Sequence, residues 1–214
     1  MNSLLPTNVM RRTIAPLFYF VLTVCILPNL AAAQTNSIVA NREMQSWKTL
    51  ASVDSKFSIS LPSTAEEVSI PIETGEKTFK MRVFMAKTTA AVYVINHVSF
   101  PDALKFKEAI EEGFNAGLDY FLEKNKDIVL KSERKVMLGR HAGREMIYES
   151  STTSIKLQTF IAREGIYTLE LTTPILFNAP EDLVKVYQAE SNKFFNSFQI
   201  LDNKKPENLK RKKH

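Results

Sequence analysis

A turn bracketed by two glycines carries the most suggestive group of charged side chains in the sequence. Gly139 and Gly143 enclose Arg140 and His141, and Arg144 follows directly. Backbone N–H groups of a glycine-containing turn can bind an anion when guanidinium groups lie beside them. The same pattern is also typical of a solvated β-turn with scattered charge. We therefore take Arg140, His141 and Arg144 as a candidate anion-binding group.

A basic run near the C-terminus is the strongest charge feature. Residues 203–214 carry six basic side chains and one acid, and four of the basic ones are consecutive: Lys210, Arg211, Lys212 and Lys213. Such a run can bind anionic lipid headgroups, at about 1 kcal/mol for each residue near the surface. It can also hold an acidic protein partner, or serve only for solubility. The polar composition predicts that residues 202–214 are disordered.

Other titratable residues give weaker signals. His97 lies in the most apolar segment, with no second His or Cys at ligand spacing, so we interpret it as a hydrogen-bonded strand histidine. Glu108, Glu111 and Glu112 could offer oxygen ligands to a divalent cation. With Lys105 and Lys107 beside it, such a set is more often the solvent face of an amphipathic helix. We predict no metal site.

Motifs of catalysis and nucleotide binding are absent. The sequence has no Gly-x-Ser-x-Gly, no His-Glu-x-x-His, no P-loop and no Gly-x-Gly-x-x-Gly. A Ser-His-Asp triad assembled from distant positions stays open, because such residues need not be close in sequence. We predict a protein that is not an enzyme and uses no cofactor.

The net charge of +5 belongs to the ends of the chain. Residues 34–202 carry 20 basic and 22 acidic side chains, so the body lacks the excess of Lys and Arg that nucleic-acid binding requires. We expect no nucleic-acid partner.

The N-terminus has the three parts of a secretory signal peptide. Arg11 and Arg12 precede the apolar segment 14–27, Pro28 ends it, and Ala33 closes a run of three alanines. We predict that residues 1–33 are removed and that the protein is exported, to the periplasm or beyond the cell. The alternative is a retained N-terminal anchor, because residues 14–33 are just long enough to span a bilayer.

The only cysteine lies inside this N-terminal segment. Cys25 follows Leu22, Thr23 and Val24, a run that superficially resembles a lipoprotein cleavage box, but Val24 is too bulky for the position before the lipidated cysteine. After cleavage at Ala33 the chain would hold no cysteine, so we expect neither disulfides nor thiolate chemistry.

Alternating hydrophobicity predicts the elements that position these side chains. Residues 127–173 have the period of two that is typical of four successive strands joined by tight turns. Residues 56–62, 67–72, 79–85 and 90–100 predict four earlier strands. Pro71 indicates a sheet edge for the second of them. Residues 90–100 are apolar at both parities, which favours a central strand covered on both faces.

Two segments have helical periodicity, from Asp102 to about residue 123 and from about residue 179 to 196, where Asn178 is the expected N-cap. Strands followed by helices predict an α+β fold, with an antiparallel sheet of about seven or eight strands and two main helices packed against it. We expect residues 34–50 to be a polar lead-in and residues 51–201 to form one domain.

The order of elements resembles the PsbP-like fold over roughly residues 50–201. The resemblance rests on the Phe-x-Ile-x-Leu-Pro strand, the Gly-x-x-x-Gly-x-x-x-x-Tyr hairpin and the last helix, with the residues Gly139, Gly143, Tyr148, Phe194, Phe195, Ser197 and Phe198. That group includes an extrinsic subunit of photosystem II, exported DcrB-like bacterial proteins and a Ran-binding protein. The resemblance implies a non-catalytic accessory or binding role and names no partner.

Three functions remain from the sequence. The first is an exported accessory protein that docks on a protein partner or an envelope complex. The second is a small-ligand-binding protein with a pocket between sheet and helices. The third is a hydrolase whose site the sequence does not reveal. The oligomeric state is not predicted.

Overall fold

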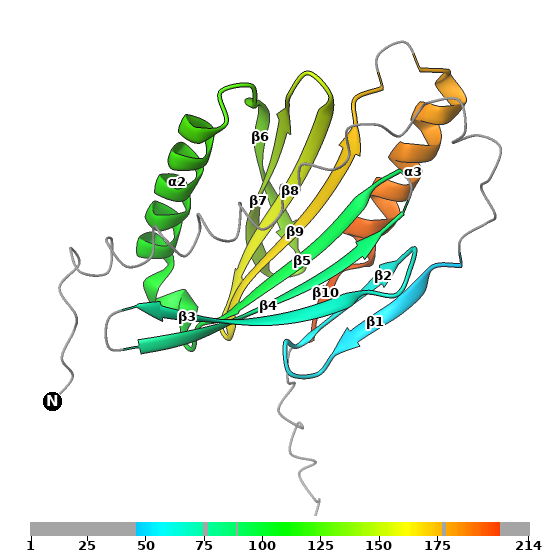
Figure 1. Ribbon diagram of the computed structural model, residues 1–214. Coiled ribbons are helices and arrows are strands. Elements are labelled where there is room, and N and C mark those ends of the chain that lie inside the picture. The colour runs from blue at the N-terminus through cyan, green and yellow to red at the C-terminus, as the bar shows by residue number, and fades with distance from the viewer. Residues whose placement is uncertain (1–45, 75–76, 89, 177–178, 202–214) are drawn as a thin grey trace, which may run out of the picture.

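The computed structural model describes residues 46–74, 77–88, 90–176 and 179–201 (Figure 1). None of its described helices combines the length and apolarity that crossing a membrane requires. The elements in chain order are β1 (Lys48–Ser52), β2 (Phe57–Leu61), β3 (Glu66–Thr74), β4 (Lys77–Lys87), β5 (Val92–Ser99), the 3-10 helix η1 (Ala103–Phe106), α2 (Lys107–Lys124), β6 (Val129–Leu138), β7 (His141–Glu149), β8 (Thr153–Ala162), β9 (Gly165–Pro174), α3 (Glu181–Ser197) and β10 (Gln199–Ile200).

The strands form two antiparallel sheets. The larger has seven strands in the order β3-β4-β5-β9-β8-β7-β6, and the smaller has three in the order β1-β2-β10. The predicted α+β fold, with helices packed against an antiparallel sheet, is confirmed. The small sheet was not foreseen as a separate unit, because β10 has only two residues and pairs with a strand about 140 positions earlier.

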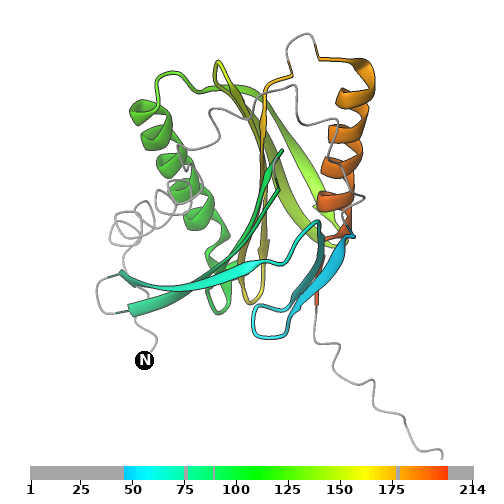
Figure 2. The same ribbon diagram turned by 45° about the vertical axis from the view of Figure 1, so that its right-hand side comes forward.

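The large sheet separates two layers of unlike composition (Figure 2). Helix α2 covers one face, which we call the α2 face. Helix α3 and the small sheet cover the other, which we call the α3 face. Each face has its own apolar cluster: Met81, Val94 and Phe114 belong to the first, and Phe57, Tyr93 and Phe194 belong to the second.

Strand β5 shows why the sheet has two cores. Along it Tyr93 and Ile95 join the α3-face cluster, while Val94 and Val98 join the α2-face cluster. Because successive side chains of a strand point to opposite faces, a strand apolar at both parities needs cover on both sides. The prediction of a central, doubly covered strand is confirmed. So is the edge position of the strand that contains Pro71, since β3 ends the sheet order.

A register shift changes the predicted pattern of β6. Leu130 and Val136 have the same parity and were expected on one face. The pairing with β7 shifts between Leu130 and Ser132, so Leu130 lies opposite Tyr148 and Val136 lies opposite Gly143. A bulge of this kind moves all later side chains to the other face. Leu130 is therefore on the α2 face and Val136 packs against the α3-face cluster.

The helix and domain boundaries differ slightly from expectation. Asp102 adopts a left-handed backbone conformation with φ of 58°, so a 3-10 turn precedes α2. In α3 the buried residues include Phe195, whereas Val186 is 38% exposed. Strand β1 begins at Lys48, within the expected lead-in 34–50. The expected signal peptide, the N-cap Asn178 and the basic tail lie outside the described residues.

Candidate ligand-binding cleft

A cleft of about 640 Å³ lies between α2 and strands β6 to β8. Its volume is within the range of about 300–1,000 Å³ that is typical of small-molecule sites. Helix α2 contributes Ile110 and Phe114, and β8 contributes Ile161. These apolar side chains belong to the α2-face cluster or line its margin, so the inner part of the cleft continues the core of that face.

Polar side chains cross the sheet side of the cleft in one row. Lys135 of β6 lies opposite Arg144 of β7, and Arg144 lies opposite Thr159 of β8. All three line the cleft. Cβ atoms of directly opposite residues on one face lie about 4.5–5.5 Å apart, so Arg144 has Lys135 beside it on one strand and Thr159 beside it on the other.

Arg144 is held in a fixed position at the middle of this row. Its guanidinium contacts the Glu133 carboxylate at 2.6 and 2.8 Å and donates to Asn115 Oδ1 of α2 at 2.5 Å. It also lies 5.5 Å from the centroid of the Phe114 ring. Contacts to a strand, a helix and an aromatic face together orient the side chain and connect the two walls of the cleft.

The charges around the cleft are almost balanced. Glu133 is paired with Arg144, and Glu111 lies 3.6 Å from the ammonium of Lys107. Lys135 is the remaining cation of the lining, and among the described residues it has no ion pair. The lining therefore carries one positive charge that a described carboxylate does not offset.

Thr159 has an unusual environment for a cleft residue. It is 8% exposed, and no described group accepts from or donates to its hydroxyl Oγ1. Leaving a buried polar group without a hydrogen bond costs about 1–3 kcal/mol. Thr159 lines the cleft, so its buried hydroxyl lies in the wall of the cleft, and a ligand that turned this hydroxyl towards itself would offset the cost of its burial.

The structure separates the predicted anion-binding group. Arg144 lines the cleft on the α2 face. Arg140 lies in the two-residue turn between β6 and β7, where Gly139 has a φ of 57°, a conformation that glycine adopts readily. His141 differs from Arg144 in parity on β7, so its side chain projects to the opposite face.

The other sequence candidates have different outcomes. Glu111 lines the cleft, and no group of three or more His, Cys, Asp or Glu side chains in the described ranges is arranged to hold a metal ion. Lys210, Arg211, Lys212 and Lys213 lie outside the part of the chain that the structure describes.

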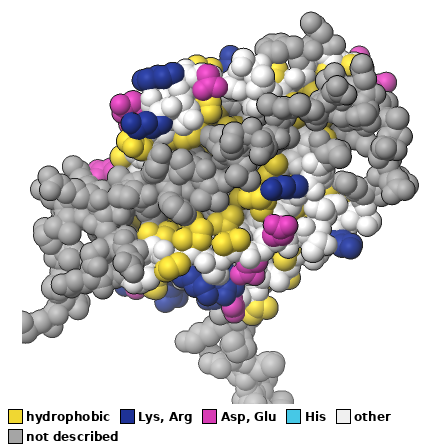
Figure 3. Space-filling model, viewed as in Figure 1, with side chains coloured by type: hydrophobic (Ala, Val, Ile, Leu, Met, Phe, Trp, Pro, Cys, Tyr) yellow, Lys and Arg dark blue, Asp and Glu magenta, His cyan; other side chains and the backbone are white. Residues whose placement is uncertain are grey.

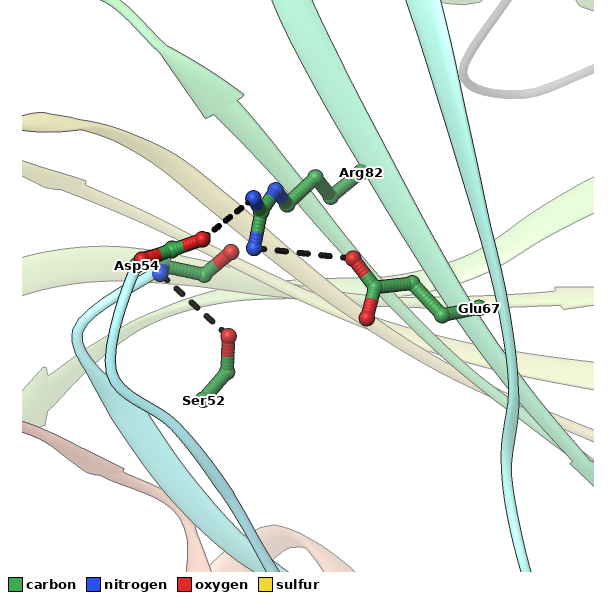
Figure 4. A network of polar contacts seen from close by, with 5 residues as sticks. Ser52, Asp54, Glu67 and Arg82 are labelled. Atoms are coloured by element: carbon green, nitrogen blue, oxygen red, sulfur yellow. Dashed lines mark hydrogen bonds and ion pairs between the residues drawn. The ribbon is translucent and has the colours of Figure 1, made fainter.

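A second polar cluster joins the small sheet to the large one. Figure 4 shows the Arg82 guanidinium of β4 between the carboxylates of Asp54 and Glu67, at 2.6 and 3.5 Å. Asp54 belongs to the turn between β1 and β2, which is closed by the Ser55 N–H donating to Ser52 Oγ. These contacts attach the turn to the large sheet.

His97 lies within this second cluster. It is opposite Arg82 on one side and Tyr167 on the other, and its ring stacks on Tyr167 at a centroid distance of 4.6 Å. Tyr167 Oη donates to the Ser55 carbonyl at 2.9 Å. His97 is 4% exposed, and its Nε2 has no described hydrogen-bond partner, so the expectation of a hydrogen-bonded histidine is not met at this atom.

The environment of His97 favours the neutral imidazole. Burial lowers its pKa to about 4, with the positive charges of Arg82 and Lys56 acting in the same direction and Glu164 acting against them. Gly165 allows this close packing, because a Cβ there would lie 2.9 Å from His97 Nε2 and 2.2 Å from the Val98 carbonyl oxygen. His97 is therefore enclosed by its neighbours.

Glu145 forms the centre of a third polar group, on the α3 face. Burial by itself raises the pKa of this carboxyl, but hydrogen bonds from Arg134 and Gln158 and the charge of Lys156 outweigh it and lower the pKa. The three contacts measure 2.6, 2.6 and 3.2 Å. Lys156 also lies over the Phe195 ring of α3. This carboxylate is fully engaged in structural contacts.

Sequence reasoning missed most of the cleft. Lys135 had a usable signal, because the two-residue turn at Gly139 fixes the pairing of β6 with β7 and places Lys135 opposite Arg144. Thr159 had none, since its importance comes from burial and from the absence of a described partner.

Comparisons with known proteins do not assign a family. No family model matches the chain, and no curated protein matches it significantly. A crystal structure from Bacteroides thetaiotaomicron is similar at 17% identity with a TM-score of 0.36, covering 75% of this chain and 50% of its own. The chain thus spans about half the length of that structure. The PsbP-like resemblance stays a prediction.

Proposed function

We propose that this protein is a non-catalytic binding protein that holds a small ligand in the cleft between α2 and strands β6 to β8. The observation that carries the proposal is Thr159, a residue that lines a cleft of about 640 Å³ and whose buried hydroxyl has no described partner. An apolar interior with a few convergent polar groups is the usual character of a ligand site.

The absence of catalysis is part of the same proposal. His97 is enclosed against Tyr167 and is 4% exposed, which leaves its imidazole out of reach of a substrate. Glu145 is engaged by three side chains. The cleft row of Lys135, Arg144 and Thr159 supplies hydrogen-bond donors, and no base lies in the row beside the hydroxyl.

The experiment is a small-molecule screen by ligand-observed NMR with a variant that fills the cleft. Ala142 is exposed, lines the cleft and lies opposite Met137, so Ala142→Trp would occupy the cleft without changing the buried core. Ala51, an exposed alanine of β1, provides the matched control Ala51→Trp.

We expect binders of the unmodified protein to be lost in Ala142→Trp and kept in Ala51→Trp. Binders that survive equally in both variants would place binding elsewhere and contradict the proposal.

Docking on a protein partner or an envelope complex is the second candidate function. It is favoured by exposed apolar side chains on the edge strand β6, where Val129, Leu130 and Met137 are 49, 44 and 66% exposed. In the view of Figure 3 hydrophobic side chains also gather over part of the large sheet, with Lys and Arg side chains beside them. Exposed apolar patches bordered by charge are typical of interaction surfaces.

A photo-crosslinking residue at Met137, compared with one at Val53, tests this second function. Val53 is 84% exposed and lies in the β1–β2 turn, away from β6. Docking through β6 predicts one defined product from position 137 and none from position 53 in the native envelope. Equal products from both positions would contradict it.

We also propose export, on the basis of the signal-peptide pattern in residues 1–33. The intact mass of the protein purified from its native cell tests this: a chain that begins at Gln34 supports cleavage and export, and a chain that retains residues 1–33 supports the anchored alternative.

A further inference from the structure

We propose that the cleft selects monoanionic ligands with an apolar body, and that a carboxylate head group binds at the row of Lys135, Arg144 and Thr159. This inference rests on the proposed function and names the chemical class of its ligand. Three features of the cleft support it: the charge of the lining, the hydrogen-bonding capacity of the row, and the separation of a polar from an apolar part.

The charge of the lining favours a single negative charge. The Glu133 carboxylate is 2.6 Å from Arg144, and the Glu111 carboxylate is 3.6 Å from Lys107. Lys135 is thus the one cation of the lining that a described carboxylate does not neutralise. A monoanion balances the charge of Lys135, an exposed residue, whereas a doubly charged phosphate ester would leave one negative charge uncompensated beside the apolar part of the cleft.

The hydrogen-bonding capacity of the row fits the two oxygens of a carboxylate. An ammonium group has three donors and no acceptor, and a hydroxyl group has one donor. Lys135 and Thr159 lie on either side of Arg144, so one carboxylate oxygen can accept from the ammonium and the other from the hydroxyl. A hydrogen bond from Thr159 to the ligand would offset the free-energy cost of burying this hydroxyl without a partner.

Arg144 acts as a positioning residue between these two donors. Its contacts with Glu133 and Asn115 hold the guanidinium on the α2 side of the row. A group already fixed by its neighbours loses little conformational entropy when a ligand binds. The carboxylate head group would therefore bind beside a side chain that is already held in position.

The apolar part of the cleft lies next to this row. Ile161 follows Thr159 by two positions on β8, so it faces the same side of the sheet, and Ile110 and Phe114 of α2 line the cleft as well. An aliphatic or aromatic body placed against these side chains gains about 25 cal/mol for each Å² of apolar surface that it buries. A ligand with a carboxylate at one end and hydrocarbon at the other matches both parts.

The test compares three probes of one chain length: octanoate, octan-1-ol and octyl phosphate. Binding is followed by backbone amide shifts of residues 142–144 and 159–161 in the full-length protein. The variant Lys135→Gln removes the charge, and Lys131→Gln is the matched control, since Lys131 is on the same strand and pairs with Glu149 at 3.6 Å.

We expect octanoate to bind more tightly than the alcohol and more tightly than the phosphate. Lys135→Gln should weaken octanoate binding about tenfold, the usual size of one hydrogen bond to a charged group, and should leave the alcohol unchanged. Lys131→Gln should change neither.

Three results would overturn this inference. Equal affinity for octanoate and octan-1-ol would show that the cleft binds ligands without selecting charge, which leaves the proposed function intact. Tighter binding of octyl phosphate than of octanoate would contradict the preference for a single negative charge. If no probe changed the amide chemical shifts, amphipathic anions would be excluded as ligands. The small-molecule screen with Ala142→Trp would then test the proposed function separately.

Discussion

The two faces of the large sheet are made from the same strands and have opposite characters. On the α3 face, aromatic rings of β2, β8, β9 and the end of α3 contact one another around Phe198. The Glu145 carboxylate on that face has three partners. On the α2 face, Lys135, Arg144 and Thr159 line a cleft, and the Thr159 hydroxyl has no described partner.

Under the proposed function, the α3 face serves stability and the α2 face serves binding. Stability favours a dense core whose polar groups are satisfied, and binding requires space and polar groups that remain unsatisfied until the ligand arrives. His97 Nε2 and Ser55 Oγ on the α3 face also have no described partner, yet the His97 ring is stacked on Tyr167 and Ser55 is fully buried, so both are enclosed. An unsatisfied atom therefore suggests binding only where it lines a cavity.

Truncating Phe198 should produce the largest loss of stability. Phe198 is 1% exposed and its ring lies 5.7 to 6.3 Å from those of Phe57, Tyr167 and Phe160. Phe198→Ala should lower the free energy of unfolding by about 3–5 kcal/mol, because it leaves a cavity in a packed cluster.

Urea unfolding measures this effect, with Leu130→Ala as the control. Leu130 is 44% exposed at the α2-face edge and should cost less than about 1 kcal/mol. Similar decreases in the free energy of unfolding for both variants would contradict the contrast between the packed cluster around Phe198 and the exposed edge at Leu130.

Acid should destabilise the protein through His97. Its folded pKa of about 4 lies below the ordinary value of 6.5, so the unfolded chain binds a proton in this range while the folded one does not. The stability is fully present above pH 6.5 and is lost as the pH falls towards 4, by about 3 kcal/mol in total.

Comparing the unfolding free energy of the protein and of His97→Gln between pH 7 and pH 5 isolates this contribution, because the carboxylates are common to both. The variant should show a smaller decrease. Parallel pH profiles would mean that the pKa of His97 is the same in the folded and unfolded chains, which would contradict the lowered pKa.

Sequence patterns predicted the strands and helices better than their pairing across the sheet. The apolar run of β5 predicted a central strand covered on both faces, because the alternation of side chains acts locally. The bulge between Leu130 and Ser132 was not foreseeable, because it shows only in the pairing with β7. Of the cleft row, Arg144 was found as a charge near glycines, and the turn at Gly139 could have placed Lys135 opposite it, whereas Thr159 required the pairing of β7 with β8 and the burial of its hydroxyl.

Binding by the cleft is tested by measuring both the stability and the octanoate affinity of Thr159→Val, which replaces the hydroxyl with a methyl group of similar size. If the cleft exists for binding, the variant should be as stable as the original or up to about 1 kcal/mol more stable, because an unsatisfied hydroxyl is removed. Its affinity for octanoate should fall severalfold, since the ligand loses a donor. A variant that is less stable and binds octanoate unchanged would assign Thr159 to the support of the fold and contradict the account.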